Sequence, residues 1–198
     1  MFYETAKGHG LPHDPFKAIV APRPIGWIST IDAQGRSNLA PYSFFNAVGE
    51  RPPMLAFSST GAKHSATFAS GTGEFVWSMA TWALRDQMNA SAASLPRGQN
   101  EFVHAGLETA PSRLVKPPRV AASPAAFECR VTELVKLKGL DGQDSGRRLV
   151  LGCVVGIHLD ERFVREGRVD TAAMRPIARG GYDEYSVVER VFTMPRPA

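Results

Sequence analysis

Alternation of apolar and polar residues is the strongest pattern in this chain. From Phe127 to Lys138 the apolar side chains share one face and the charged side chains the other. From Leu149 to Leu159 every odd position is apolar. The connector from 141 to 146, with glycines at both 142 and 146, predicts that the two strands pair as a hairpin with a longer loop.

A second hairpin is predicted nearer the N-terminus. A strand from Ile25 to Asp32 is followed by the Gly-containing loop 32–35 and a partner strand from Ser37 to Phe44. Because Pro41 cannot donate to a ladder, regular pairing is expected to fail near it. This predicts that Tyr42 to Asn46 form a loop with free backbone groups.

The middle of the chain mixes short strands with helices. Strands are predicted over 54–57 and 74–79, and a short helix through Ala66 that stops at Gly71 or Gly73. Helical spacing of Leu84, Met88 and Leu95 predicts an amphipathic core helix over 82–95. The segment 97–124, rich in Pro and Gly, is a binding loop, a subunit contact or a surface connection.

This element order predicts one domain over residues 1–198, mostly β with added helices, arranged as an antiparallel barrel. Residues 1–22, with prolines at 12, 15 and 22, are expected to form an extended N-terminal segment packed on the domain surface. Strands and helices do not alternate regularly, and no GxGxxG joins a strand to a helix, so a Rossmann nucleotide site is not indicated.

Composition narrows the function classes. The 43% hydrophobic content suits a globular core, and the formal charge of +4 comes from scattered basic residues rather than from the clusters typical of nucleic-acid binding. No apolar segment is long enough to cross a membrane, and the N-terminus lacks a signal-peptide core, so a cytoplasmic protein is predicted. Cys129 and Cys153 lie far apart without metal-ligand spacing and are predicted to be reduced, buried thiols, with no metal bound.

Three features could carry chemistry. Ser58 to Ser65 combines hydroxyls, Gly61 and Lys63 with a helix start, which suits a phosphate; an ordinary helix cap is the alternative. Tyr42 to Asn46 offers aromatic faces and polar groups for a planar ring, or forms a buried aromatic cluster with Asn46 in a turn. His158 lies beside Gly152 and Gly156 on one strand face, where a ligand or another backbone can approach, or is an ordinary histidine at a strand end.

The residues also resemble a known family, the flavin reductase-like proteins with an FMN-binding split barrel. The resemblance rests on ProArgProIleGlyTrpIleSerThr at 22–30, AsnLeuAlaProTyrSerPhePheAsn at 38–46, and ArgProIleAlaArgGlyGlyTyr at 175–182. Weaker support comes from ProPro at 52–53, the LysHisSer turn at 63–65 and GluPheVal at 74–76. It covers most of the chain from about residue 15 onward.

The resemblance implies a homodimeric split barrel that binds one FMN per subunit near the dimer interface. It implies cofactor contacts by Trp27, Ser29 and Thr30, ring contacts by Tyr42, Ser43, Phe44, Phe45 and Asn46, and phosphate contacts by Ser58, Ser59, Lys63 and Ser65. His158 and Tyr182 are the candidates for the substrate side of the ring. No side chain is assigned as a catalytic acid or base, because the cofactor performs the hydride chemistry.

The leading functional hypothesis is an NAD(P)H-dependent flavin reductase, with a monooxygenase as the partner that would use the reduced flavin. The alternatives are a flavoredoxin-like electron carrier and a flavin-binding protein without turnover. The sequence leaves NADH and NADPH equally open, because no nucleotide motif places a ribose-reading residue.

Overall fold

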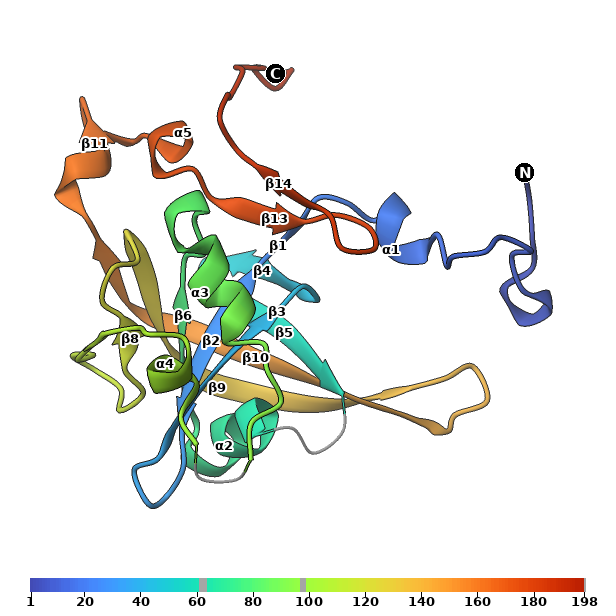
Figure 1. Cartoon of the computed structure of the whole chain (residues 1–198), viewed down its shortest axis with the longest axis horizontal. Helices are drawn as coiled ribbons and strands as arrows, with labels where there is room; N and C mark the ends of the chain where they lie inside the picture. The colour runs from blue at the N-terminus through green and yellow to red at the C-terminus, as the bar shows by residue number, and fades with distance from the viewer. Residues whose placement is uncertain (61–63, 97–98, 198) are drawn as a thin grey trace.

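A computed structural model describes residues 1–60, 64–96 and 99–197, and it is mostly β (Figure 1). The strands are β1 Arg23–Pro24, β2 Gly26–Ile31, β3 Ser37–Tyr42, β4 Phe45–Glu50, β5 Pro53–Thr60, β6 Glu74–Ser78, β7 Thr109–Ala110, β8 Arg119–Val120, β9 Ala125–Lys138, β10 Asp144–Leu159, β11 Val164–Arg165, β12 Arg168–Val169, β13 Ile177–Arg179 and β14 Tyr185–Val187. The α-helices are α1 Phe16–Ile19, α2 His64–Thr72, α3 Arg85–Ala90, α4 Glu101–His104 and α5 Thr171–Met174; 3-10 turns cover Thr5–Lys7, Trp82–Leu84 and Glu161–Phe163.

The main sheet contains seven strands in the order β3-β2-β6-β9-β10-β5-β4, and each neighbouring pair is antiparallel. One core cluster draws buried side chains from strands spread across this order, among them Ile28 of β2, Phe57 of β5 and Phe75 of β6. Because β2 and β5 are not neighbours in the sheet, the sheet must curl for these side chains to pack together. The predicted antiparallel barrel is thereby confirmed.

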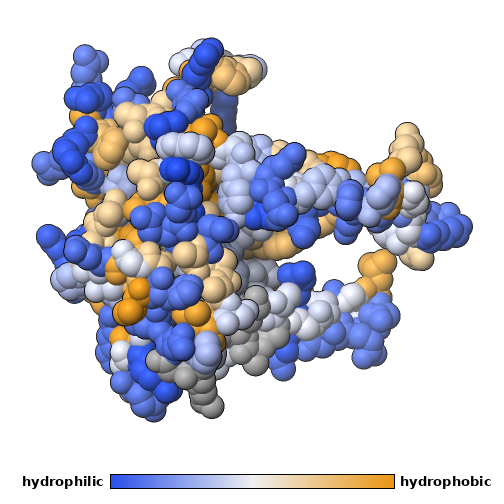
Figure 2. All heavy atoms as spheres, viewed as in Figure 1, coloured by the Kyte–Doolittle hydropathy of each residue, from blue (hydrophilic) through white to orange (hydrophobic). Residues whose placement is uncertain are grey.

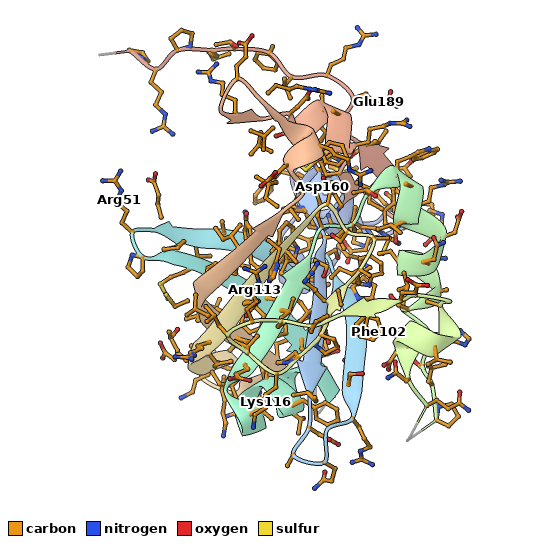
Figure 3. All side chains as sticks on the ribbon, turned by 90° about the vertical axis from the view of Figure 1, so that its left-hand side faces the viewer. Arg51, Phe102, Arg113, Lys116, Asp160 and Glu189 are labelled. Carbon is orange, nitrogen blue, oxygen red and sulfur yellow. The ribbon has the colours of Figure 1, made fainter. Side chains whose placement is uncertain are left out.

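A second layer covers the outer face of β2 and β3. Trp27 and Leu39, both fully buried, pack there with Met88 of α3 and Phe102 of α4. Figure 3 shows the connection that carries Arg113 and Lys116 crossing the outer face of the sheet. The described part of this segment, residues 99–124, therefore covers a core face and contains α4, β7 and β8.

A strand near the N-terminus pairs with two strands near the C-terminus in a smaller sheet, β1-β13-β14. The N-terminal residues before β1 contain two short helical turns and project away from the barrel rather than lying flat on it (Figure 1). Figure 2 shows an open notch between this projection and the tip of the β9–β10 hairpin. None of the helices in the described ranges is both long and apolar enough to cross a membrane.

The predicted break at Pro41 is wrong. Pro41 pairs with Trp27, and the ladder continues to Tyr42 opposite Gly26. β3 lies at the edge of the sheet, and an edge strand tolerates a proline because only one of its sides is paired. The predicted loop 42–46 therefore shrinks to Ser43 and Phe44, and a strand that was not predicted, β4, begins at Phe45.

The apolar face predicted for β10 is also turned the wrong way. Val150 and Gly152 are the buried positions, so the even residues of this stretch face the barrel interior and Leu149 and Leu151 face outward. Two irregularities in the pairing with β9, at Leu151/Gly152 and at Val154/Gly156, then shift the register. A bulge inserts one residue and so reverses which face the following side chains occupy.

Two further element predictions hold in part. The helix predicted after Ser65 is α2, and it ends before Gly73, which has φ +73°. The helix predicted over 82–95 is shorter, because a 3-10 turn precedes α3 and α3 ends at Ala90. Its core positions Leu84 and Met88 are buried as predicted.

Candidate functional site

Two hollows border the short connection between β3 and β4. The first, the aromatic groove, has a volume of about 390 Å³ and lies between the N-terminal segment and the outer face of β4, β5 and β10. Its lining residues are Phe16, Lys17, Val20, Pro22, Arg23, Pro24, Ser43, Phe44, Phe45, Asn46, Val48, Ala56, Ser58 and Leu149. It therefore brings together four residues predicted to contact a ring with one predicted to contact a phosphate.

The sequence positions the aromatic side chains of this groove by alternation. Phe44 is 38% exposed, with the Arg147 guanidinium 5.0 Å from its ring centroid. Phe45 turns to the barrel side and stacks on Trp77, with ring centroids 5.8 Å apart. Gly26 makes this possible, because a Cβ there would overlap the Phe45 ring. The Ser58 amide donates to the Phe44 carbonyl at 2.8 Å and ties the connection to β5.

The charge of the groove is positive. Lys17 and Arg23 line it, and its described lining contains no carboxylate. Arg23 is only 7% exposed, and its guanidinium donates to the backbone carbonyls of Lys17, Val20 and Gly180 without a carboxylate partner among the described residues. A buried cation without a counter-charge favours an electron-rich or anionic ligand beside it.

The second hollow, the hydroxyl pocket, has a volume of about 230 Å³ at the open edge of β3. Its lining residues are Asn38, Ala40, Tyr42, Ser65, Ser91, Ala92, Ala93, Ser94, Leu95 and Glu101. Asn38 donates to the Ser65 Oγ at 2.8 Å, and Glu101 accepts the Leu39 amide at 3.2 Å. The open edge of β3 is thus partly closed by a side chain from α4.

Buried hydroxyls gather behind this pocket. Thr30 is the cross-strand partner of Asn38, and Ser59 lies near the Tyr42 hydroxyl. Thr30 and Ser59 are almost completely buried, yet neither side-chain oxygen makes a well-formed hydrogen bond with the described residues. The Ser58 oxygen, at the edge of the groove, has no such partner either. Leaving a buried hydroxyl unsatisfied costs about 1–3 kcal/mol, so the hydroxyls beside the hollows are candidates for contact with a ligand.

Tyr42 connects the two hollows, because it lines the pocket and the next residue lines the groove. Burial raises the pKa of the Tyr42 hydroxyl; the neighbouring Ser65 and Ser59 hydroxyls oppose this shift, and the charge of Glu101 adds to it. Tyr42 therefore stays protonated at neutral pH and can donate a hydrogen bond. Its ring packs on Phe57 at 5.1 Å, which fixes its position.

Trp27 and Ser29 lie elsewhere. Both are fully buried on the opposite face of β2 from Thr30, and neither lines the groove or the pocket. Trp27 reaches the pocket only through its indole N–H, which donates to the Ser91 Oγ at 2.9 Å. The Ser29 oxygen is buried without a described partner, in the layer beneath the segment 97–124.

His158 belongs to a separate polar cluster. Its Nε2 lies 2.5 Å from Oε1 of Glu128. The Glu128 carboxylate also accepts hydrogen bonds from the Arg113 amide, at Oε1 and 2.7 Å, and from the Leu114 amide, at Oε2 and 2.6 Å. Desolvation of the buried Glu128 raises its pKa, but the His158 and backbone hydrogen bonds outweigh it and leave the pKa lowered. His158 lines neither hollow.

The glycines beside His158 make room for side chains of the same chain. A Cβ at Gly152 would overlap the Phe75 ring, and one at Gly156 would touch Leu114 and Glu128. The predicted close approach is therefore observed, and the Phe75 and Leu114 side chains fill the space that the prediction left open to a ligand or another backbone.

The remaining two predicted residues lie apart from the hollows or outside the described ranges. Tyr182, with φ +49°, sits in the β13–β14 turn, and its ring is 5.6 Å from that of His13. Tyr182 also lines neither hollow. Lys63 lies outside the described residues, so its predicted phosphate contact stays a prediction.

Sequence reasoning missed several residues that the fold brings to the site. Arg23 stood inside the quoted motif, but nothing in its neighbours predicted a buried charge. Asn38 and Ala40 could have been found from alternation, because they share a face with Tyr42 on an edge strand. Residues 91–95 carry no local signal and reach the pocket only through tertiary packing.

Comparison with known proteins shows the family to which the chain belongs. The family model "Flavin reductase like domain" matches residues 20–172, which include both hollows apart from Phe16 and Lys17. A protein of Deinococcus radiodurans is 39% identical over 193 residues, covering 90% of this chain and 82% of that one.

Solved structures share the fold over nearly the whole chain. Nitrilotriacetate monooxygenase component B from Bacillus cereus superposes with a TM-score of 0.88 at 26% identity, covering 98% of each chain. Flavoredoxin of Desulfovibrio vulgaris has a TM-score of 0.79 at 20% identity, covering 88% of this chain and 91% of that one. The second likeness shows the fold alone.

Proposed function

The chain belongs to the flavin reductase-like domain family, and on this premise we propose that it binds FMN and reduces it with NADH or NADPH. The observation that carries the proposal is the set of buried hydroxyls of Thr30, Ser58 and Ser59, which lack well-formed hydrogen bonds among the described residues. Ser58 lies beside the β3–β4 connection, where the aromatic, positively charged groove opens, and Thr30 and Ser59 lie behind the hydroxyl pocket.

The two hollows suit the two ends of FMN. The hydroxyl pocket, with Tyr42, Ser65 and the nearby start of α2, provides donors for a ribityl chain and phosphate. The groove provides Phe44 as an apolar surface, with Ser43 and Asn46 as polar groups for the edge of a ring. We assign Lys63 to the phosphate as well.

The bound flavin supplies the two-electron chemistry, so the protein need only bind and orient it. The buried Arg23 guanidinium favours negative charge in the groove and so favours the electron-rich, reduced form. Tyr42, whose pKa is raised by burial, donates a hydrogen bond without introducing a negative charge. No side-chain acid or base is required for hydride transfer.

We also propose that two copies of the chain pair through the outer face of β5 and β10. Leu149 and Leu151 lie on this face, opposite Ser58 and Ala56 of β5, and Leu149 also lines the groove. A second copy seated there would adjoin the proposed flavin site. Sedimentation should find a dimer that Leu151→Glu converts to monomer; a monomeric parent protein would contradict this.

A monooxygenase is the proposed consumer of the reduced flavin. The likeness to a monooxygenase component B at 26% identity supports this assignment. Release of reduced flavin to a partner fits a groove that is open on the surface rather than an enclosed cavity.

The decisive test is anaerobic mixing of the FMN-loaded protein with NADH or NADPH while the visible flavin absorbance is followed. Rapid bleaching by one nucleotide is expected. Stable absorbance with both nucleotides would contradict the reductase and favour an electron carrier. A protein that takes up no flavin on titration would contradict the proposal entirely.

A further inference from the structure

A third hollow, larger than the other two, lies between the helical segment 82–90 and the strands β13 and β14 of the small sheet. Its volume is about 450 Å³, and it is enclosed by the 3-10 turn Trp82–Leu84, by α3, and by β13 and β14. We name it the arginine–aromatic pocket. The proposed FMN site does not account for it, although two of its lining residues, Ile177 and Arg179, belong to the 175–182 motif.

The pocket has an apolar floor and aromatic walls. Met88 and Ile177 form the floor and are almost completely buried, and Val187 packs against the same core cluster. Trp82 and Tyr185 line the sides with their rings, and the two residues are 42% and 41% exposed. Partly exposed rings above a buried apolar floor suit a planar, apolar group.

Two guanidinium groups at the rim are held in place by their own surroundings. Arg179 lies 4.6 Å from the Tyr185 ring centroid and donates to the Tyr185 hydroxyl and the Tyr182 carbonyl. Arg85 lies 4.3 Å from the Trp82 ring centroid and donates to the Trp82 carbonyl at 2.7 Å. Both cations are therefore preorganised beside an aromatic wall.

The acidic residues at the rim are less constrained. Asp183 pairs with Arg179 at 3.1 Å, but its side chain is fully exposed, and the Asp86 side chain is 79% exposed beside Arg85. Exposed ion pairs of this kind contribute little and are readily replaced. A carboxylate or phosphate of a ligand could take their place on the guanidinium groups.

We propose that the arginine–aromatic pocket binds a planar aromatic group that carries a carboxylate or phosphate. Two sources offer this chemistry: the adenosine phosphate half of the nicotinamide nucleotide, or an aromatic carboxylate. The first source rests on the proposed function. It is supported by the closeness of this pocket to the aromatic groove. Arg179 lines the pocket and Arg23 lines the groove, and the two residues are paired on neighbouring strands about 4.8 Å apart.

The test uses flavin-free protein and isothermal titration with AMP, benzoate, adenosine and inorganic phosphate. AMP or benzoate should bind more tightly than adenosine or phosphate, which each lack half of the recognised chemistry. Arg179→Gln should weaken this binding about tenfold through loss of a charge-assisted contact. Arg165→Gln, at an exposed arginine of β11 that does not line the pocket, is the matched control and should change it less than twofold.

Tyr185→Leu provides a second variant if Arg179→Gln lowers the melting temperature, and it should weaken AMP or benzoate binding severalfold. Preference for AMP identifies the nucleotide donor, and preference for benzoate identifies an aromatic substrate. Equal binding of phosphate and AMP, no binding of either aromatic anion, or binding unaffected by both variants would overturn the proposal. FMN titration of the same samples reports separately on the proposed function.

Discussion

The molecule contains two buried polar clusters that differ in how well they are satisfied. Around Glu128, a carboxylate that is 1% exposed accepts three backbone amides, including that of Val115 at 3.1 Å, and contacts His158. Behind the hydroxyl pocket, the buried hydroxyls of Thr30 and Ser59 lack well-formed hydrogen bonds with the described residues. The first cluster is satisfied within the folded chain, whereas the second leaves hydroxyls available for the proposed ligand.

This difference separates a structural role from a binding role. Glu128 fastens the segment 113–115 to β9, so its contacts are internal to the fold. The hydroxyl cluster borders a hollow at an open sheet edge, where a ligand can reach it. Burial and polarity are common to both clusters, and only the hydrogen-bond partners distinguish them.

Removing the carboxylate should cause the largest loss of stability. Glu128→Ala would leave three backbone amides and His158 without their buried acceptor, and we expect a loss of about 3–5 kcal/mol in the free energy of unfolding. Chemical denaturation measures this change. Glu133→Ala, at an exposed position on the same strand, is the control, with an expected change of about 0.5 kcal/mol or less. Comparable losses in both variants would refute the anchoring role.

Gly152 tests whether the space near β10 is reserved for packing. Gly152→Ala should overlap the fully buried Phe75 ring and cost about 1–3 kcal/mol, because the ring lies in a close-packed core. Affinity for FMN should stay within twofold when measured on the folded variant. Unchanged stability together with lost flavin binding would instead restore a ligand role for this glycine.

The His158→Gln substitution tests whether the Glu128 cluster has a structural role or takes part in turnover. His158→Gln keeps a donor near Glu128 and should cost about 1 kcal/mol of stability, with little effect on turnover. Steady-state kinetics with the nicotinamide nucleotide would reveal the alternative. A large change in KM or kcat with normal stability would return His158 to the substrate side of the flavin.

The pH dependence of stability should show a smaller effect of the same cluster. The folded-state pKa of Glu128 is lowered, so its contribution is present above the ordinary glutamate pKa of about 4.3 and is lost as pH falls below it through the folded value. Glu128→Gln should therefore flatten the acid limb of the stability profile. An unchanged acid limb would mean that other carboxylates account for it.

The sequence predicted the strands with clear alternation and the helix α2, and it placed the end of this helix at Gly71 or Gly73, of which Gly73 is correct. It did not predict β4, because residues 45–50 alternate poorly and form an exposed edge strand held by pairing with β5. It also misassigned the faces of β10, because the apolar odd face turns outward and bulges later shift the register.

The site was predictable only as far as local signals reach. Ser43, Phe44, Phe45, Asn46 and Ser58 do meet in one groove. Trp27 was assigned to the cofactor, but alternation on β2 turns it to the opposite face from Thr30 and into the core. The wall formed by residues 91–95 and the buried charge of Arg23 depend on contacts between distant segments, which periodicity does not reveal.

The central claim is tested most directly by comparing one unpaired hydroxyl with one paired hydroxyl. Ser59 has no well-formed hydrogen bond among the described residues, whereas the Ser123 hydroxyl lies 2.9 and 2.8 Å from the Met79 and Ala125 carbonyl oxygens and can donate its proton to either. FMN titration of flavin-free Ser59→Ala should show about tenfold weaker binding with unchanged stability. Ser123→Ala should instead lower the stability and leave the affinity for FMN unchanged. Equal FMN affinity in Ser59→Ala and the parent protein would contradict the assignment of the hydroxyl pocket to the flavin.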